Sequence, residues 1–570
     1  MEIQKLIAAS ILLIASCTVL CAQQPTPTPK KADEPVTNGV IDGRVVNENG
    51  QGMSGATVFV RATNSAGAGR QTTTDIEGNF RVAGLEPALY TVSASAPAYT
   101  SAGSADPFTP TYHRIGDTVR IELVRGGAIT GTVTNAVGEP VVAVRVRATM
   151  VRDARGEGGK LVPYITQEQP TDDRGVYRIY GLRPGTYIVS AGGAGFAYAF
   201  NPYDQDVPTY APSASRDSAA EILVRSGEDS NIDIRYRGEP GHLISGTVKV
   251  AGTNGSAVAL TQAGSAVPLG NTYQPDGARG FSFTGLGDGD YDIVAQELAS
   301  NPNNTTTPSF AVSEPKRVSI KGADVTGIEL TTRPLLSLTG KIALEPSKAP
   351  ECQGKRPPLF AEMVVRLQKP EKEKDQEDST VLRFLAGSAS PDASGAFQLR
   401  NLFPGKYQFE PQFYARYWYL QSITVSAGTA KPQKIDAAAN WTTLKPGDQL
   451  ANLTITIAEG AASIRGRMPA PEGAATATGM SVYLVPAEPD KADDVLRYFV
   501  SAIGDDQTFA FNNVPPGKYL TVIDTSPSSL SKLRLPESAS TRTKLRRAAE
   551  AKKNAIELKP CQTLTDFQLK

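Results

Sequence analysis

Short segments in which apolar and polar residues alternate make up most of the chain from residue 39 onward. On one face of the segment 56–62 lie four small apolar residues, Ala56, Val58, Val60 and Ala62. Because successive side chains of a β-strand point to opposite faces, this period of two predicts half-buried antiparallel strands. Turns rich in Asp and Gly, such as residues 75–78, follow these segments and predict hairpins. The pattern therefore predicts an all-β protein.

One segment near the carboxyl end departs from this alternation. Residues 536–554 read PESASTRTKLRRAAEAKKN, and their Ala, Leu, Lys, Glu and Arg content predicts a short helix inserted before the last strand. Its apolar residues are few, so we expect the helix to cover one edge of the last domain rather than to bind a membrane or nucleic acid.

Two short patterns recur at domain-sized intervals. The first is a Gly with an apolar residue two positions before and after it, at Gly43, Gly131, Gly246, Gly340 and Gly466. The second resembles Gly-Leu-x-Pro-Gly-x-Tyr and ends at Tyr90, Tyr187, Tyr291, Tyr407 and Tyr519. Their interval of about 90 to 125 residues fits whole domains rather than the small repeats of a solenoid. We therefore predict five tandem antiparallel β-sandwich domains.

The two patterns also set the expected domain limits. We expect a signal peptide at 1–22, a Pro- and Thr-rich linker at 23–38, and β-sandwiches, called units 1 to 5 below, at 39–125, 126–239, 240–335, 336–460 and 461–570. The helical insertion 536–554 belongs to unit 5. The linker has the composition of a semi-rigid extended spacer.

We interpret the Tyr-containing pattern as a structural corner. Its Leu supplies a buried anchor, its Pro a fixed φ and its Gly a permissive backbone for reversing the chain. Tyr90, Val92 and Ala94 then alternate, so we expect the ring to pack inward with its hydroxyl at the rim of the sandwich. A ligand-binding role for the motif is the alternative.

The opening Gly strand, the Asp/Gly hairpin, the Tyr-containing corner and the closing strand together resemble the carboxypeptidase regulatory-like family. The resemblance implies β-sandwiches of the transthyretin-like (prealbumin) or Cna B-type, immunoglobulin-like kind. It covers nearly the whole chain after the linker, most clearly units 1 and 2. It implies the architecture and location of secreted bacterial multidomain proteins more than an activity.

The amino-terminal residues predict export. Lys5 precedes the apolar stretch 6–15, which is too short to span a bilayer. Cleavage after Ala22 is the favoured route. The alternative is lipidation of Cys17, because residues 14–17 resemble a bacterial lipobox, and we expect attachment to a membrane only in that case.

Export makes the two remaining cysteines informative. Cys352 and Cys561 form an even number in an oxidising compartment, so they are candidates for a disulfide. Two unpaired cysteines are the alternative, because the sequence does not place their Cα atoms within reach.

Composition and motifs favour binding over catalysis. Lys plus Arg and Asp plus Glu both number 58, so no net charge attracts nucleic acid. Neither His113 nor His242 begins a zinc-peptidase pattern, and we expect no catalytic residue, cofactor or metal. Asp288, Asp290 and Asp292 offer carboxylates for Ca²⁺, but a solvated turn is favoured because the loop lacks a bidentate Glu.

Aromatic residues gather in two segments. One contains Tyr414, Tyr417, Trp418 and Tyr419, and the other covers residues 196–210. Exposed rings stack on sugars or anchor protein partners, so the first group is a candidate ligand platform. Packing within a core or between domains is the alternative.

These observations predict an exported, non-enzymatic scaffold that acts in binding or adhesion in the periplasm, at the outer-membrane surface or outside the cell. The expected partner is an envelope protein or a polysaccharide, and not nucleic acid. The alternatives are a carbohydrate-binding accessory protein and an accessory module for an outer-membrane transporter or peptidase. The sequence carries no signal for an oligomeric state.

Overall fold

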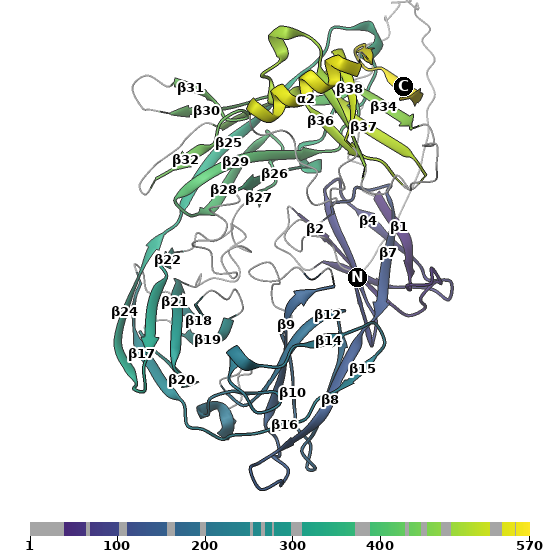
Figure 1. Cartoon of the computed structure of the whole chain (residues 1–570). Helices are drawn as coiled ribbons and strands as arrows, with labels where there is room; N and C mark the ends of the chain where they lie inside the picture. The colour runs from purple at the N-terminus through teal and green to yellow at the C-terminus, as the bar shows by residue number, and fades with distance from the viewer. Residues whose placement is uncertain are drawn as a thin grey trace, which may run out of the picture.

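The structure is a computed structural model that describes residues 39–569 except 64–68, 102–110, 155, 157–165, 194–200, 251–254, 264–267, 276–278, 298–310, 371–387, 428–432, 446–452, 469–479, 505, 525–538 and 553. The predicted signal peptide, the linker and Cys17 lie outside the described residues. Within them the chain is mostly β-strand, with one α-helix, α2 (Ala539–Lys552), near the carboxyl end (Figure 1). The mostly β fold in tandem units and the late helix are confirmed. The division into five sandwich domains at the stated limits stays a prediction.

Units 1 and 2 each contain two groups of strands around an apolar core. The strand orders are β4-β1-β7-β6 and β3-β2-β5 in unit 1, and β11-β8-β15 and β10-β9-β12-β13 in unit 2, where β14 pairs with β12 and β16 with β8. The strands of unit 1 are β1 (Gly39–Val46), β2 (Thr57–Ala62), β3 (Arg70–Thr73), β4 (Asn79–Leu85), β5 (Tyr90–Ser95), β6 (Tyr99–Ser101) and β7 (Thr118–Arg125). Those of unit 2 are β8 (Gly127–Thr134), β9 (Arg145–Asp153), β10 (Thr166–Pro170), β11 (Val176–Leu182), β12 (Gly185–Ala191), β13 (Thr209–Tyr210), β14 (Ile222–Val224), β15 (Asp229–Asn231) and β16 (Ile234–Arg235), with the 3₁₀ turns η1 (Pro202–Gln205) and η2 (Arg216–Ser218).

Unit 3 differs because its strands form one continuous sheet. The order is β19-β18-β21-β22-β24-β17-β20, and β23 pairs with β21. The short strand β22 (Ala311–Ser313) pairs with both β21 and β24 and so joins the two halves of the sheet. The other strands are β17 (His242–Lys249), β18 (Ser256–Gln262), β19 (Pro268–Gln274), β20 (Gly280–Leu286), β21 (Gly289–Glu297), β23 (Lys316–Ile320) and β24 (Val325–Pro334).

Units 4 and 5 again have two sheets each. The orders are β28-β25-β33-β30-β31 and β27-β26-β29-β32 in unit 4, and β37-β34-β40 and β36-β35-β38-β39 in unit 5. The elements of unit 4 are β25 (Leu336–Glu345), η3 (Pro350–Cys352), η4 (Phe360–Glu362), β26 (Met363–Gln368), β27 (Ser388–Ala389), β28 (Ala396–Leu402), β29 (Gly405–Phe413), β30 (Trp418–Ala427), β31 (Gln433–Asp436), β32 (Thr442–Leu444) and β33 (Leu453–Glu459). Those of unit 5 are β34 (Ala462–Arg467), β35 (Ser481–Pro486), η5 (Pro489–Lys491), η6 (Val495–Arg497), β36 (Phe499–Ala502), β37 (Thr508–Val514), β38 (Gly517–Asp524), α2, β39 (Ala555–Leu558) and β40 (Thr563–Gln568).

The predicted alternation places one face of each strand in a core. In β2, Val58 and Val60 are buried, whereas Phe59 between them is 43% exposed. Each unit range contains one of the five largest hydrophobic clusters of the described residues, and each cluster draws side chains from several strands of that range.

The expectation of purely antiparallel sheets is wrong at one recurring place. The opening strand of each unit pairs in parallel with a closing strand: β1 with β7, β8 with β15 and β16, β17 with β24, β25 with β33, and β34 with β40. The chain passes through the strands of the other sheet group before it returns, so the closing strand arrives beside the opening strand in the same direction.

This close approach explains the repeated Gly of the opening strands. A Cβ atom on Gly131 would lie 1.8 Å from the carbonyl oxygen of Ile232 in the closing segment. On Gly466 it would lie 2.3 Å from the ring of Phe509 in the neighbouring β37. Any larger residue would force the strands or the covering ring apart.

The Tyr-containing motif forms the expected corner in every unit. Each Tyr hydroxyl donates a hydrogen bond of 2.7–2.9 Å to the carbonyl oxygen four residues earlier, in the pairs Tyr90 and Glu86, Tyr187 and Arg183, Tyr291 and Gly287, Tyr407 and Phe403, and Tyr519 and Pro515. The first motif residue adopts a left-handed backbone, with φ of 72° at Gly181 and 61° at Asn401, where the pairing register shifts. Gly and Asn tolerate this backbone best, which accounts for their use there.

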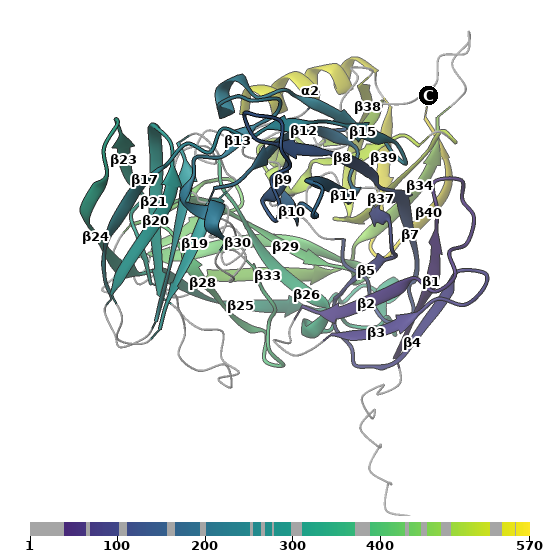
Figure 2. The same ribbon diagram turned by 90° about the horizontal axis from the view of Figure 1, so that it is seen from below.

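The units follow one another around the molecule, so that unit 4 lies beside unit 1 (Figures 1 and 2). Leu89 and Tyr112 of unit 1 pack against Val364 of β26, and all three side chains are at most 8% exposed. The hydroxyl of Ser390 in unit 4 lies 3.2 Å from that of Thr63 in unit 1. Contacts between distant parts of the sequence therefore fix the arrangement of the units.

Candidate functional site

The predicted aromatic platform lies where units 1, 4 and 5 meet. Tyr414 is 38% exposed, and the guanidinium of Arg114 from unit 1 lies 5.7 Å from its ring centroid. Arg114 also donates a hydrogen bond of 3.1 Å to the Tyr414 carbonyl. Arg114 of unit 1 therefore covers part of the Tyr414 ring.

Trp418 cannot serve as a platform, and this part of the prediction is wrong. Its side chain is only 3% exposed and belongs to the core of unit 4. Trp418 begins β30 and pairs with Glu459 of β33, so the alternation of the strand turns its indole inward.

The two neighbouring tyrosines, Tyr417 and Tyr419, also make contacts within the protein. The ring of Tyr417 has the ammonium of Lys355 at 4.8 Å and the guanidinium of Arg416 at 5.3 Å from its centroid. Tyr419 is partly buried, and this burial raises the pKa of its hydroxyl. Both residues thus contribute to packing at the junction.

The backbone of the same segment fastens unit 5 to unit 4. The side-chain amide of Asn513 donates hydrogen bonds to the carbonyl oxygens of Ala415, at 2.7 Å, and Trp418, at 2.6 Å. The carbonyl of Tyr417 accepts from the backbone amides of Gly460 and Ala461 at 2.8 and 2.9 Å. The structure therefore uses the aromatic segment as an interdomain junction.

Cys352 and Cys561 form a disulfide across this junction, with their Cα atoms 5.4 Å apart. Cys352 ends η3 of unit 4, and Cys561 occupies the turn between β39 and β40 of unit 5. Cys561 has a left-handed φ of 55°, and its amide donates to the Gly460 carbonyl at 3.0 Å. Both cysteines are buried.

One histidine lies beside the acidic turn of unit 3. The imidazole nitrogens of His242 lie 3.7 Å from a carboxylate oxygen of Asp288 and 3.6 Å from a carboxylate oxygen of Asp324. His113 bridges to Tyr90 within unit 1, and burial lowers the pKa of its imidazole. In the turn of unit 3, the carboxylate of Asp292 pairs with Arg317 at 2.8 Å, and Asp288 accepts from the amide of Gly322 at 2.6 Å. In the described part of the chain, no three His, Cys, Asp or Glu side chains come together as metal ligands would.

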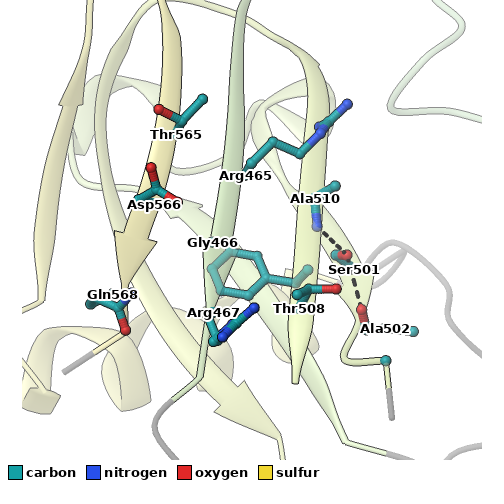
Figure 3. Close-up of a pocket in the computed structure, with 12 residues that line it drawn as sticks. Arg465, Gly466, Arg467, Ser501, Ala502, Thr508, Ala510, Thr565, Asp566 and Gln568 are labelled. Atoms are coloured by element: carbon teal, nitrogen blue, oxygen red, sulfur yellow. Dashed lines mark hydrogen bonds between the residues drawn. The ribbon is translucent and has the colours of Figure 1, made fainter. Parts of the chain in front are cut away.

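The structure instead shows an open groove of about 1060 Å³ on unit 5 (Figure 3). Its base is the outer face of β34, β37 and β40, and one end of β36 borders it. Small residues widen the groove, and its polar lining consists of Arg465, Arg467, Ser501, Thr508, Thr565, Asp566 and Gln568.

Local geometry explains why the lining residues point outward. Arg465 and Arg467 flank the inward-facing position of Gly466 on β34, so the alternation exposes both guanidinium groups. A register shift between β34 and β40, with a φ of 58° at Asp566, brings this carboxylate to the same face.

The groove carries both donors and acceptors. Arg465 donates to the side-chain oxygen of Asn512 at 3.0 Å and reaches across β37. Hydrogen bonds from Thr508, assisted by the charge of Arg467, lower the pKa of Asp506 at the nearby hairpin. In the residues that the structure describes, neither arginine forms an ion pair within 4.0 Å.

The groove was not predicted from the sequence, because the β34 segment matches the repeated Gly pattern that the fold itself requires. The two arginines that flank the repeated Gly466 could have indicated this site, because both lie on the exposed face of an opening strand. Unit 1 has Asp42 and Arg44 at the corresponding positions.

Comparison with known proteins supports the fold of unit 1. Residues 40–115 match the carboxypeptidase regulatory-like domain family. Unit 1 contains a carboxypeptidase regulatory-like domain. No curated protein matches the chain.

Solved structures that resemble parts of the chain include two bacterial pilins and the Bacillus anthracis TIE protein. The minor pilin GBS52 of Streptococcus agalactiae is 11% identical, with 35% of this chain and 95% of that chain covered and a TM-score of 0.20. The major pilin subunit BcpA of Bacillus cereus is 13% identical, with 52% and 100% covered and a TM-score of 0.14. The Bacillus anthracis TIE protein is 13% identical, with 75% and 76% covered and a TM-score of 0.15. Similarity at this level carries no argument about function.

Proposed function

We propose that the chain is an exported, non-enzymatic scaffold in which five β-sandwich domains hold a binding surface in a fixed orientation, in the periplasm or at the cell surface. The observation that carries this proposal is the fastening of units that are distant in sequence. A disulfide links units 4 and 5 across 209 residues, and a buried apolar contact links units 1 and 4.

The disulfide also supports an extracytoplasmic location, because such bonds persist in oxidising compartments and are rare in a reducing cytosol. The repeated Tyr and Asp residues support a scaffold because they stabilise corners and hairpins. Asp172, for example, accepts hydrogen bonds from the amides of Arg174 and Val176 at 3.0 and 2.8 Å.

A polysaccharide is the partner that the groove of unit 5 favours, and an envelope protein is the alternative. Guanidinium, hydroxyl, amide and carboxylate groups in one open concavity match a ligand rich in hydroxyl groups, which both donates and accepts hydrogen bonds. The carboxylate of Asp566 opposes a uniformly anionic ligand such as nucleic acid.

The test is binding of the purified mature chain to isolated cell envelopes and to a glycan array. We expect binding that the variant R465Q/R467Q weakens at least tenfold, because each lost charged hydrogen bond costs about 1.5 kcal/mol or more. The matched control is R44Q/K341Q, which changes the equivalent exposed position of the opening strands in units 1 and 4. Equal loss in both variants, or no envelope binding by the parent chain, contradicts the proposal. Capture of a transporter or a peptidase with unchanged affinity in R465Q/R467Q would assign binding to another surface.

A further inference from the structure

Helix α2 covers one sheet of unit 5 and leaves its opposite face exposed (Figures 1 and 2). Its inner side contains the buried Ala549 and Arg542 and the partly buried Leu545. Ala549 and Leu545 pack with Val485, Tyr498 and Val522 of the underlying sheet and loop. The helix covers unit 5 as expected, but it lies over β35 and β38, the two middle strands of the sheet, and not over an edge. Few apolar residues anchor it there.

The outward face of α2 is cationic. Lys544, Arg547 and Lys552 are exposed, and with 100° per residue they fall within an arc of about 140° that borders the buried stripe on one side. Ala548 and Ala551 lie between them in the same arc, and both are exposed.

The one acidic residue of the helix does not neutralise this face. Glu550 pairs with Arg546, whose side chain is 17% exposed, at 2.9 Å on the flank of the helix. In the described part of the chain, none of the three outward cations forms an ion pair within 4.0 Å. Their charges are available to a partner.

The charge is local to this insertion. Residues 536–554 contain six basic and two acidic residues, a net charge of +4, whereas the whole chain has a net charge of zero. The positive field therefore comes from one side of unit 5 and orients the molecule toward an anionic surface.

We propose that the outward face of α2, defined by Lys544, Arg547 and Lys552, binds the headgroups of an anionic lipid surface. The face is convex, so a flat lipid surface contacts all three cations at once over about 12 Å of helix. An extended polymer would find no groove there to enclose it. Alanine is the only apolar residue between the cations, so contact is electrostatic and no side chain inserts. In the described residues, no helix has the length and apolar composition to cross a membrane.

The contact differs from the groove and from lipidation of Cys17. It lies on the other sheet of unit 5, because α2 contacts β35 and β38, whereas the groove lies on β34, β37 and β40. It also operates in the chain without a covalent lipid, so it departs from the expectation that attachment requires lipidation of Cys17. The few apolar residues of the helix predicted no membrane binding, but an electrostatic contact requires none, and it weakens as salt screens the charges.

The experiment is sedimentation of the mature chain with vesicles of equal parts phosphatidylglycerol and phosphatidylcholine, and with vesicles of phosphatidylcholine alone. We expect binding to the anionic vesicles only, and a fall in affinity of about 100-fold in K544Q/R547Q/K552Q, since each surface cation contributes about a factor of five at low salt. Gln is a good helix former, and circular dichroism checks that the helix remains.

The control variant is R61Q/R81Q/R120Q, which removes the same charge from exposed positions of unit 1 and should keep its binding. R465Q/R467Q should also keep its binding to anionic vesicles. The test of lipid binding by α2 is therefore independent of the test of ligand binding by the groove. Equal binding to both vesicle types, or unchanged binding in K544Q/R547Q/K552Q, overturns the proposal. Displacement of the chain from vesicles by soluble polygalacturonate below the lipid concentration would assign the face to an acidic polysaccharide instead.

Discussion

The corner of unit 2 offers a direct test of how the repeat stabilises the fold. Tyr187 is fully buried in the core, and its hydroxyl donates to the Arg183 carbonyl at 2.9 Å. Replacing Tyr187 by Phe keeps the ring and removes this hydrogen bond. Burial raises the pKa of the Tyr187 hydroxyl, so the group lost at neutral pH is the uncharged donor.

The expected loss is about 1 kcal/mol, the net contribution of a buried hydrogen bond, and rises to about 2 kcal/mol if the carbonyl stays unsatisfied. This corresponds to a factor of about five to thirty in the opening equilibrium of unit 2. Hydrogen exchange of peptides from β9 and β12, read by mass spectrometry, measures that equilibrium within the full chain.

The matched control is Tyr180→Phe in the same unit. Tyr180 is 58% exposed, so its hydroxyl is solvated and the substitution should change stability by less than about 0.5 kcal/mol. If the two variants exchange at the same rate, or if Tyr187→Phe protects unit 2 as well as the parent does, the corner hydrogen bond does not stabilise the unit.

The remaining predictions concern one pKa, the disulfide, a buried indole and the contact between units 1 and 4. Burial raises the pKa of Tyr291 from 10.0 to about 12, so the unfolded chain loses this proton at lower pH than the folded chain does. Unit 3 should therefore lose about 2 to 3 kcal/mol of stability between pH 10 and 12. Tyrosinate absorbance and hydrogen exchange of unit 3 peptides test this, and a rise in stability over that range would refute it. C352S/C561S should speed amide exchange at the junction of units 4 and 5 while strand content stays constant by circular dichroism, whereas unchanged exchange would show that the bond is dispensable there. Trp418→Ala should destabilise unit 4 by about 3 to 5 kcal/mol in exchange experiments, and a loss of glycan binding without destabilisation would contradict its burial. Val364→Asp should separate unit 1 from unit 4 and raise the radius of gyration in small-angle X-ray scattering, and an unchanged radius would show that this contact does not close the molecule.

The parts of the fold that depend on local chemistry could be predicted from the sequence. The left-handed residue, the reversal and the inward Tyr lie within seven positions, so the motif around Tyr187 specifies its own corner. The Asp hairpins follow for the same reason, since Asp172 bonds to amides within four residues.

Contacts between units could not be predicted in this way. The contact between units 1 and 4 uses residue types that any core position could have, at Leu89, Tyr112 and Val364. Nothing in the sequence therefore distinguishes these residues from those of a core within one domain. The parallel pairing of opening and closing strands was missed because alternation gives the faces of a strand and not its direction. Trp418 was misassigned because an aromatic run at the start of a strand leaves open which of its rings points inward.

The two proposed binding surfaces lie where unit 5 departs from the repeat. Residues that the units share are buried or hydrogen-bonded within the fold, so they are not available to a partner. Unit 5 departs most: it alone among the described units carries an α-helix, and it places two arginines around the repeated Gly466 and a cysteine at 561. The disulfide fixes this unit to unit 4, and the contacts of unit 4 with unit 1 fix the remainder. The groove and the cationic face of α2 lie on different sheets of unit 5, so a rigid junction gives each surface a defined orientation relative to the other units.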